Sequence, residues 1–172
     1  MENLVSLDDG GANRDATVEH IRKVQFLSDL EADEIKMLAE WSRTYSAKEG
    51  DTIFNEGSEI TNLCFLVEGR VSISKQVSPF ESVKISDIDA GGVIGEIGII
   101  DGETVSATVK ASQDSIIVII TGQDFDKMIE QNGLLGSKIL RKIARIVTAK
   151  LRNTTSMLAD VSMSRESKML RY

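Results

Sequence analysis

The chain has 172 residues, of which 41% are hydrophobic and 27% charged, a composition typical of a folded globular domain and not of a disordered or fibrous chain. This length suits one domain with an added arm or helix and excludes a hidden second catalytic domain. No apolar run approaches 18 residues and the N-terminus lacks the features of a secretory signal, so no membrane span or export is expected. The single cysteine, Cys64, cannot form an internal disulfide; this suits a reducing compartment, and we expect a cytoplasmic protein.

Charge is distributed unevenly along the chain. Residues 1–132 carry 11 basic and 25 acidic side chains, whereas residues 133–172 carry 9 basic and 2 acidic ones, so the body is acidic and the C-terminal region basic. Two explanations stay open: the basic region complements its own acidic domain, or it contacts an anionic partner such as lipid or nucleic acid.

The N-terminal region carries helical signals. Residues 1–16 are polar and Gly-rich, and we expect a flexible arm there. A short helix is predicted for Thr17–Val24. Ser28 followed by Glu31 forms a capping-box pattern, which predicts a second helix that ends near Ser42.

From Thr44 to Ile120 the sequence is typical of a β-domain. Short β-branched or alternating runs are separated by Gly-containing turns. The predicted strands are Thr52–Asn55, Leu63–Glu68, Val71–Gln76, Ser82–Ile88, Ser106–Ala111 and Ser115–Ile120. So many short strands in succession predict an antiparallel sandwich or barrel.

Helical periodicity returns after Gly122, with a short helix predicted for Gln123–Gln131, a break at Asn132–Gly133 and then a long helix. Spacings of four and three alternate along the long helix, as in the a and d positions of a coiled coil. These positions are Leu140, Ala144, Val147, Leu151, Thr154, Leu158 and Val161. A second stripe, Ile139, Ile143 and Ile146, is expected to pack on the chain's own sheets. We predict a homodimer through this helix; alternatively, both stripes belong to the core of a single chain.

The segment Gly91–Ala111 carries the strongest candidate for a ligand site. Val93–Ile94 is predicted to end a strand, Gly95 to permit a left-handed turn, and Glu96–Ile100 to form one helical turn. Outward-pointing amides at the start of such a turn favour an anion. The Glu96 carboxylate can accept hydrogen bonds from two adjacent hydroxyls, such as those of a ribose.

The order of glycines and apolar residues on both sides of this segment resembles that of a known family. The residues that carry the resemblance are Tyr45, Gly50, Ile53, Gly57, Leu63–Val71, Ala90–Ile99 and Ser106–Val109. They are similar to the cyclic nucleotide-binding domain shared by catabolite activator proteins, kinase regulatory subunits and nucleotide-gated channels, over about Gln25 to Ser156. The resemblance implies a mainly β jelly-roll barrel with flanking helices and a long C-terminal dimerisation helix.

The resemblance also assigns roles to individual residues. Gly95 and Glu96 open the phosphate-binding cassette, and Glu96 would contact the ribose 2′-hydroxyl. The amides near Ile97 and Gly98, and the Ser106 side chain, would contact the cyclic phosphate. Thr154 and Thr155 fall where catabolite activators contact the base from the dimer helix. The ligands implied are cAMP or cGMP, and no cofactor is required.

The sequence departs from the family at Val105, which stands where the phosphate-binding arginine is expected. Residues 85–109 contain no Lys or Arg but five acids, which are Asp87, Asp89, Glu96, Asp101 and Glu103. The sequence shows no basic side chain nearby, because Lys110 would point to the opposite face of its strand. Helix-end amides, Ser106 or a basic side chain from elsewhere in the chain could replace part of the missing contact. Losing an arginine–phosphate contact weakens binding by about tenfold to a thousandfold. We expect cyclic nucleotides to bind weakly or not at all; the alternatives are a genuine cAMP or cGMP sensor with an altered phosphate site, or an uncharged ligand.

The predicted organisation is an arm (1–16), a helical lead-in with the β-barrel (17–132), a dimer helix (133–161) and a tail (162–172). Because His20 is the only histidine and no nucleophile–base pair is found, we expect neither a metal set based on histidines nor an enzyme. If the chain is full length, the tail is too short for the DNA-binding domain of a catabolite activator.

Two functions remain. The first is a regulatory dimer whose ligand shifts the long helices through a hinge near residues 132–136. The second is an interaction protein with a vestigial pocket that presents a surface to a protein partner.

Overall fold

The computed structural model describes residues 4–7, 14–59 and 61–169. The chain divides into two compact units, residues 1–136 and 137–172. The elements are β1 (Val5–Ser6), α1 (Arg14–Lys23), η1 (Gln25–Leu27), α2 (Ala32–Glu40), β2 (Arg43–Ala47), β3 (Thr52–Phe54), β4 (Asn62–Glu68), β5 (Arg70–Ser78), β6 (Glu81–Asp89), β7 (Val93–Ile94), α3 (Glu96–Asp101), β8 (Thr108–Ala111), β9 (Ser115–Thr121), α4 (Gly122–Gln131) and α5 (Gly133–Met169). The first unit holds the strands, the short helices and the start of α5; the second unit is the remainder of the chain.

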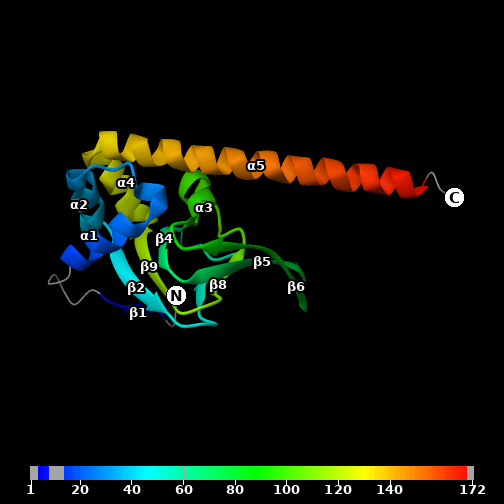
Figure 1. The fold of residues 1–172 in the computed structure, drawn as a ribbon, viewed down its shortest axis with the longest axis horizontal. Helices are drawn as coiled ribbons and strands as arrows, with labels where there is room; N and C mark the ends of the chain where they lie inside the picture. The colour runs from blue at the N-terminus through cyan, green and yellow to red at the C-terminus, as the bar shows by residue number, and fades with distance from the viewer. Residues whose placement is uncertain (1–3, 8–13, 60, 170–172) are drawn as a thin grey trace. The chain divides into compact units, whose positions relative to one another are not determined.

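Two antiparallel sheets form the body of the first unit (Figure 1). One sheet has the strand order β1-β2-β9-β4-β7, and the other has the order β3-β8-β5-β6. Helix α1 packs on β2, β4 and β9, while α3 contacts β4 and α4 contacts β9. The predicted fold class, mainly β with flanking helices, is confirmed, and so is a long C-terminal helix.

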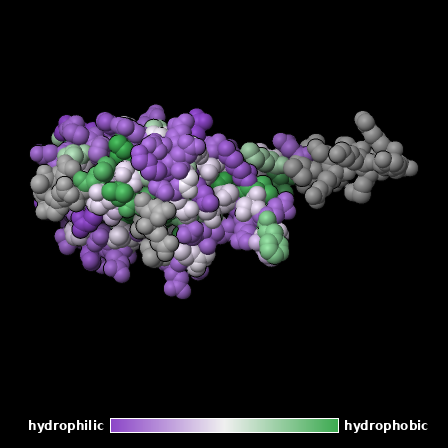
Figure 2. Space-filling model, turned by 90° about the horizontal axis from the view of Figure 1, so that it is seen from below, coloured by the Kyte–Doolittle hydropathy of each residue, from purple (hydrophilic) through white to green (hydrophobic). Residues whose placement is uncertain are grey.

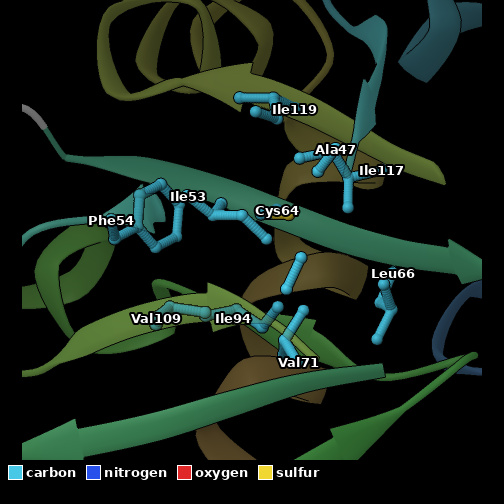
Figure 3. Close-up of a cluster of buried hydrophobic side chains, with 11 residues drawn as sticks. Ala47, Ile53, Phe54, Cys64, Leu66, Val71, Ile94, Val109, Ile117 and Ile119 are labelled. Carbon is cyan, nitrogen blue, oxygen red and sulfur yellow. The ribbon is translucent and has the colours of Figure 1, made fainter. Parts of the chain in front are cut away.

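Strands β4 and β9 read as continuous apolar runs because both of their faces are buried. Cys64 and Leu66 of β4 belong to the cluster between the sheets (Figure 3), whereas Phe65 stacks on Phe26 of η1 with ring centroids 5.9 Å apart. A strand buried on both faces has no polar side to show, so alternation is absent from its sequence.

The cluster between the sheets combines side chains from seven strands, which converge on one another in Figure 3. Its members are Ala47, Ile53, Phe54, Cys64, Leu66, Val71, Ile94, Val109, Ala111, Ile117 and Ile119. Each fully buried large side chain of this kind contributes about 1.5–3 kcal/mol relative to an exposed one. The cluster therefore fixes the two sheets on which the candidate site is built.

The N-terminal elements differ from the prediction. Val5–Ser6, in the predicted arm, pair with β2 through Val5↔Ser46, and α1 begins at Arg14. The capping box is formed by Glu31 and Glu34 and not by Ser28, so α2 begins three residues after the expected position. The sequence pattern did not predict β2, whose neighbours are β1 and β9.

Helix α5 begins at Gly133, four residues before Ser137, where the helical pattern became regular, and continues to Met169, beyond the predicted limit at Val161. The predicted break at Asn132–Gly133 is the boundary between two helices, because Asn132 is the C-cap of α4 and α5 begins at Gly133. Within the described residues, no helix combines the length and apolarity required to cross a membrane. The face drawn in Figure 2 is largely hydrophilic, with apolar atoms in small separate groups.

Candidate functional site

The turn between β7 and α3 has the local geometry that the sequence predicted. Gly95 is in the left-handed region with φ +84°, and Glu96 begins a short helix in which Ile99 N donates to Gly95 O at 3.2 Å. A Cβ added to Gly95 would overlap the carbonyl oxygen of Asn62 and lie 3.3 Å from the Phe54 ring. Glycine is required here both for the backbone conformation and for the close approach to β4.

The start of α3 presents one buried acid and an exposed apolar residue. Glu96 is only 3% exposed, whereas the Ile97 side chain is exposed. Gly98 lies against Thr61, the residue before β4, because an added Cβ would be 3.0 Å from Thr61 Cγ2. A carboxylate this deeply buried is uncommon, and it is retained where its oxygens accept hydrogen bonds.

Beyond α3 the chain is held by the turn that follows β3. Val105 N donates to Ser58 O at 2.9 Å, and Val105 O accepts from Gly57 N at 2.8 Å. The Val105 side chain is half-buried and packs against the cluster between the sheets, while Ser106 is exposed. The position expected to hold an arginine is therefore occupied by a side chain that extends the apolar core.

Lys75 on β5 is a residue of this region that the sequence analysis missed. Its Nζ donates to the Ser106 carbonyl oxygen at 2.6 Å and lies 2.8 Å from Glu56 Oε1. A basic side chain does arrive from elsewhere in the chain, because β5 pairs with β8 through Ser74↔Thr108 and brings Lys75 to the cassette. Only the register between two strands far apart in sequence reveals this proximity.

Glu56 is held on both sides of its carboxylate. Its Oε2 accepts from Gln76 N at 2.9 Å, and its Oε1 contacts Lys75 Nζ. The hydrogen bond from Gln76, followed by that from Lys75, lowers the pKa of Glu56 below its ordinary value. The positive charge of Lys75 is thus already balanced by an ionised neighbour at neutral pH.

Thr154 and Thr155 belong to the second unit. Both are exposed, and each donates its hydroxyl to the carbonyl four residues earlier, on Lys150 and Leu151, at 2.9 Å. A contact between these threonines and a ligand in the barrel stays a prediction.

A cavity of about 500 Å³ is bordered by Gly98 and Ile99 of α3, the start of β4 and the start of α4. Of the predicted ligand-binding residues it includes Gly98, but not Glu96, Val105 or Ser106. It therefore coincides with only a small part of the site that the sequence predicted. In the part of the chain that the structure describes, no three His, Cys, Asp or Glu side chains are grouped as a metal site would need.

Comparisons with known proteins give the following matches. The family model described as cyclic nucleotide-binding domain matches residues 45–132, just over half of the chain. An uncharacterized NTE family protein of Mycobacterium tuberculosis is 27% identical over 128 residues, which make up 74% of this chain and 21% of that protein. The chain thus spans about a fifth of the length of this relative.

Two solved structures share the fold at low sequence identity. A cyclic nucleotide-binding domain from Methylobacillus flagellatus KT has a TM-score of 0.76 and 23% identity, and the match covers 92% of this chain and 89% of that one. The regulatory subunit of a cAMP-independent protein kinase A from Trypanosoma cruzi, bound to guanosine, has a TM-score of 0.65 and 23% identity over 79% of this chain and 48% of that one.

Proposed function

Because the chain belongs to the cyclic nucleotide-binding domain family, we propose that it is a non-catalytic regulatory module with a degenerate phosphate cassette, which binds cyclic nucleotides weakly or not at all. The observation that carries this proposal is the environment of Val105, a half-buried apolar residue packed on the core at the position of the family's arginine. In this proposal Gly95, Glu96, Ile97, Gly98 and Ser106 form what remains of the cassette.

Charge balance is the physical reason for weak binding. A bidentate arginine–phosphate contact is charge-assisted and contributes about 1.5–3 kcal/mol, which corresponds to roughly one to two orders of magnitude in affinity. The charged residues of segment 85–109 are all acids, and one of them, Glu96, is buried in the fold. A cyclic phosphate would enter a region of like charge, where backbone amides and Ser106 would assist it and the nearby cation, Lys75, is already paired with Glu56.

A titration with cAMP and cGMP, followed by NMR, tests the proposal. We expect wild-type dissociation constants weaker than about 50 µM, and a gain of about tenfold or more in Val105→Arg, which restores the charge-assisted contact. Val105→Leu is the matched control, since it keeps the residue apolar and should leave the affinity as it is. Saturable wild-type binding below about 50 µM would instead support the genuine sensor.

An uncharged ligand is a second candidate that one comparison favours. The Trypanosoma cruzi structure holds guanosine, a nucleoside without phosphate, in a protein whose fold matches this chain. A nucleoside would use the Glu96 carboxylate through its ribose and would need no cation beside Ser106. Titration with guanosine and adenosine tests this candidate: nucleoside binding at least as tight as that of the cyclic nucleotides supports it.

The output of the module is proposed to pass through a homodimer of α5. The expected seam positions Val147, Leu151 and Leu158 are exposed, and Met157 beside them is 68% exposed. Ligand binding would shift the α5 helices through the α4–α5 boundary, to the extent that the ligand binds one arrangement more tightly than the other. If no ligand binds, the same dimer would serve as a surface for a protein partner.

A further inference from the structure

We propose that Lys75 is the cation that contacts the anionic group of a ligand in the cassette, and that Glu56 restrains it, so that the Lys75–Glu56 pair sets how strongly this site prefers a phosphate-bearing ligand. The inference rests on the proposed function, because it concerns the weak cyclic nucleotide site of that proposal. The observation behind this inference is the position of Lys75 Nζ, which lies 2.6 Å from Ser106 O and 2.8 Å from Glu56 Oε1.

Strand alternation places Lys75 on the same face of β5 as Val71 and Ile73. Alternate residues of a strand share a face, and Val71 and Ile73 both pack on the core cluster, where Figure 3 shows Val71. β5 pairs regularly with β8 from Val71↔Ala111 to Ser74↔Thr108, the residue before Lys75, while its pairing with β6 shifts register between Ile73 and Ser74. The contact of Lys75 Nζ with Ser106 O then places the ammonium group beside the residue that follows Val105.

The ammonium group of Lys75 already lies at the cassette, on a flexible side chain. Besides Glu56 it contacts the carbonyl of Ser106, the residue whose hydroxyl is expected to meet a phosphate oxygen. The side chain is 48% exposed, so no buried packing has to be broken for the flexible stem to reorient. A small rotation would bring Nζ from the Ser106 backbone to a ligand held by that residue.

Glu56 competes with any anion for this lysine. Its side chain is only 21% exposed and is anchored by Gln76 N, whose hydrogen bond is the largest cause of its lowered pKa. The pair is neutral, so an incoming phosphate must replace a carboxylate as the partner of Lys75. This competition gives a second reason for weak phosphate binding, in addition to the presence of valine in place of arginine at position 105.

The other basic side chains of β5, β6 and β8 have different positions. Arg70 pairs with Asp89 at 2.6 Å and Lys84 pairs with Asp87 at 2.8 Å, both within the β5–β6 hairpin. Lys110 lies on the opposite face of β8 from Val109 and is exposed. The Lys84–Asp87 pair therefore offers a matched control, because it carries the same charges on the same hairpin but does not contact the cassette.

The test compares cAMP with adenosine in NMR titrations of wild type, Glu56→Gln, Lys75→Gln, the double variant, and the controls Asp87→Asn and Lys84→Gln. Glu56→Gln keeps an acceptor for Gln76 N and frees Lys75, so it should strengthen cAMP binding by about tenfold and leave adenosine binding as it is. Adding Lys75→Gln should abolish that gain, and the control variants should reproduce wild type. Lys75→Arg retains the charge and should keep the preference for cAMP, which separates loss of the cation from damage to the fold.

An unchanged cAMP affinity in Glu56→Gln would overturn the inference, as would an equal gain for adenosine or a gain that survives Lys75→Gln. Wild-type binding of cAMP below about 50 µM that Lys75→Gln weakens would contradict the proposed function but support this inference. The same tight binding without any effect at residues 56 or 75 would overturn both.

Discussion

The α-carbon of Gly95 lies directly against the backbone of Asn62, so that a Cβ at residue 95 would overlap the Asn62 carbonyl oxygen. Gly95→Ala is therefore expected to suffer both from the left-handed backbone conformation and from this overlap, and to lose about 3 kcal/mol or more of unfolding free energy. Urea denaturation followed by circular dichroism measures the loss.

Gly102→Ala is the matched control for that experiment. Gly102 also has a positive φ, +69°, at the other end of α3, but nothing lies within 4 Å of an added Cβ. It should lose only the cost of the left-handed conformation, about 1–2 kcal/mol. Equal losses in the two variants would show that the contact with Asn62 adds nothing.

Cys64 is expected to be inert to thiol reagents until the protein unfolds. The side chain is fully buried in the core cluster, and burial raises the pKa of its thiol far above the ordinary value. A protonated, inaccessible thiol does not react, so labelling by a disulfide reagent should follow the rate of global opening. Fast stoichiometric labelling of the folded protein would contradict the burial of β4.

The same thiol should make stability fall at alkaline pH. The unfolded state releases the Cys64 proton above about pH 8.5, whereas the folded state retains it, so the unfolding free energy decreases by up to about 1.4 kcal/mol per pH unit above that point. Cys64→Ala lacks this proton and should show a shallower decline between pH 8.5 and 10, although it is less stable at pH 7. Parallel declines in both proteins would exclude the effect.

The fold class was predictable from the sequence because the changes in hydrophobic period are strong. The glycine-punctuated strands and the long last helix both appear in the structure. The first residues of the elements were less predictable. Ser28 and Glu31 are alternative N-cap residues for α2, and the reciprocal contacts between Glu31 and Glu34 place the N-cap at Glu31. β1 is only two residues long, and its pairing with β2 depends on partners that its own sequence does not reveal.

In the candidate site, too, local features were predictable from the sequence and long-range contacts were not. Gly95, Glu96 and Val105 were identified because the conformations and side chains involved are local to one segment. Lys75 was missed because its contact with Ser106 depends on pairing between β5 and β8, which are about thirty residues apart in sequence. Thr154 and Thr155 lie on a separate unit, so their part in the site stays a prediction.

Asp114 is expected to stabilise the protein only above its pKa. Its carboxylate contacts Lys48 Nζ at 2.6 Å and accepts from Glu49 N at 3.0 Å, and these contacts, that of Lys48 first, lower the pKa of Asp114 below its ordinary value. A lowered folded-state pKa gives stability that is present above the unfolded-state pKa and lost as pH falls through the folded-state value. Asp114→Asn should therefore be less stable than wild type at pH 7, and the difference should shrink below pH 4.

The Lys48 partner provides the check on this assignment. Lys48→Gln should remove part of the same stability, and the double variant should lose less than the sum of the two single variants. Because both side chains are exposed, the coupling should also decrease in high salt. A difference between wild type and Asp114→Asn that does not vary with pH would show that the carboxylate charge is not its cause.

The last prediction concerns the oligomeric state of α5. Leu151 and Leu158 are 65% and 66% exposed at expected seam positions, and burying such side chains against a second copy would contribute about 1.5–3 kcal/mol each. Leu151→Glu places a charge in that seam and should convert a dimer into a monomer, as measured by light scattering after gel filtration. Asn153→Glu adds the same charge at a position outside the 4-3 pattern, so it should leave the dimer intact. A wild-type chain that is monomeric at high micromolar concentration would contradict the homodimer, and an equal effect of both variants would exclude the predicted seam as its interface.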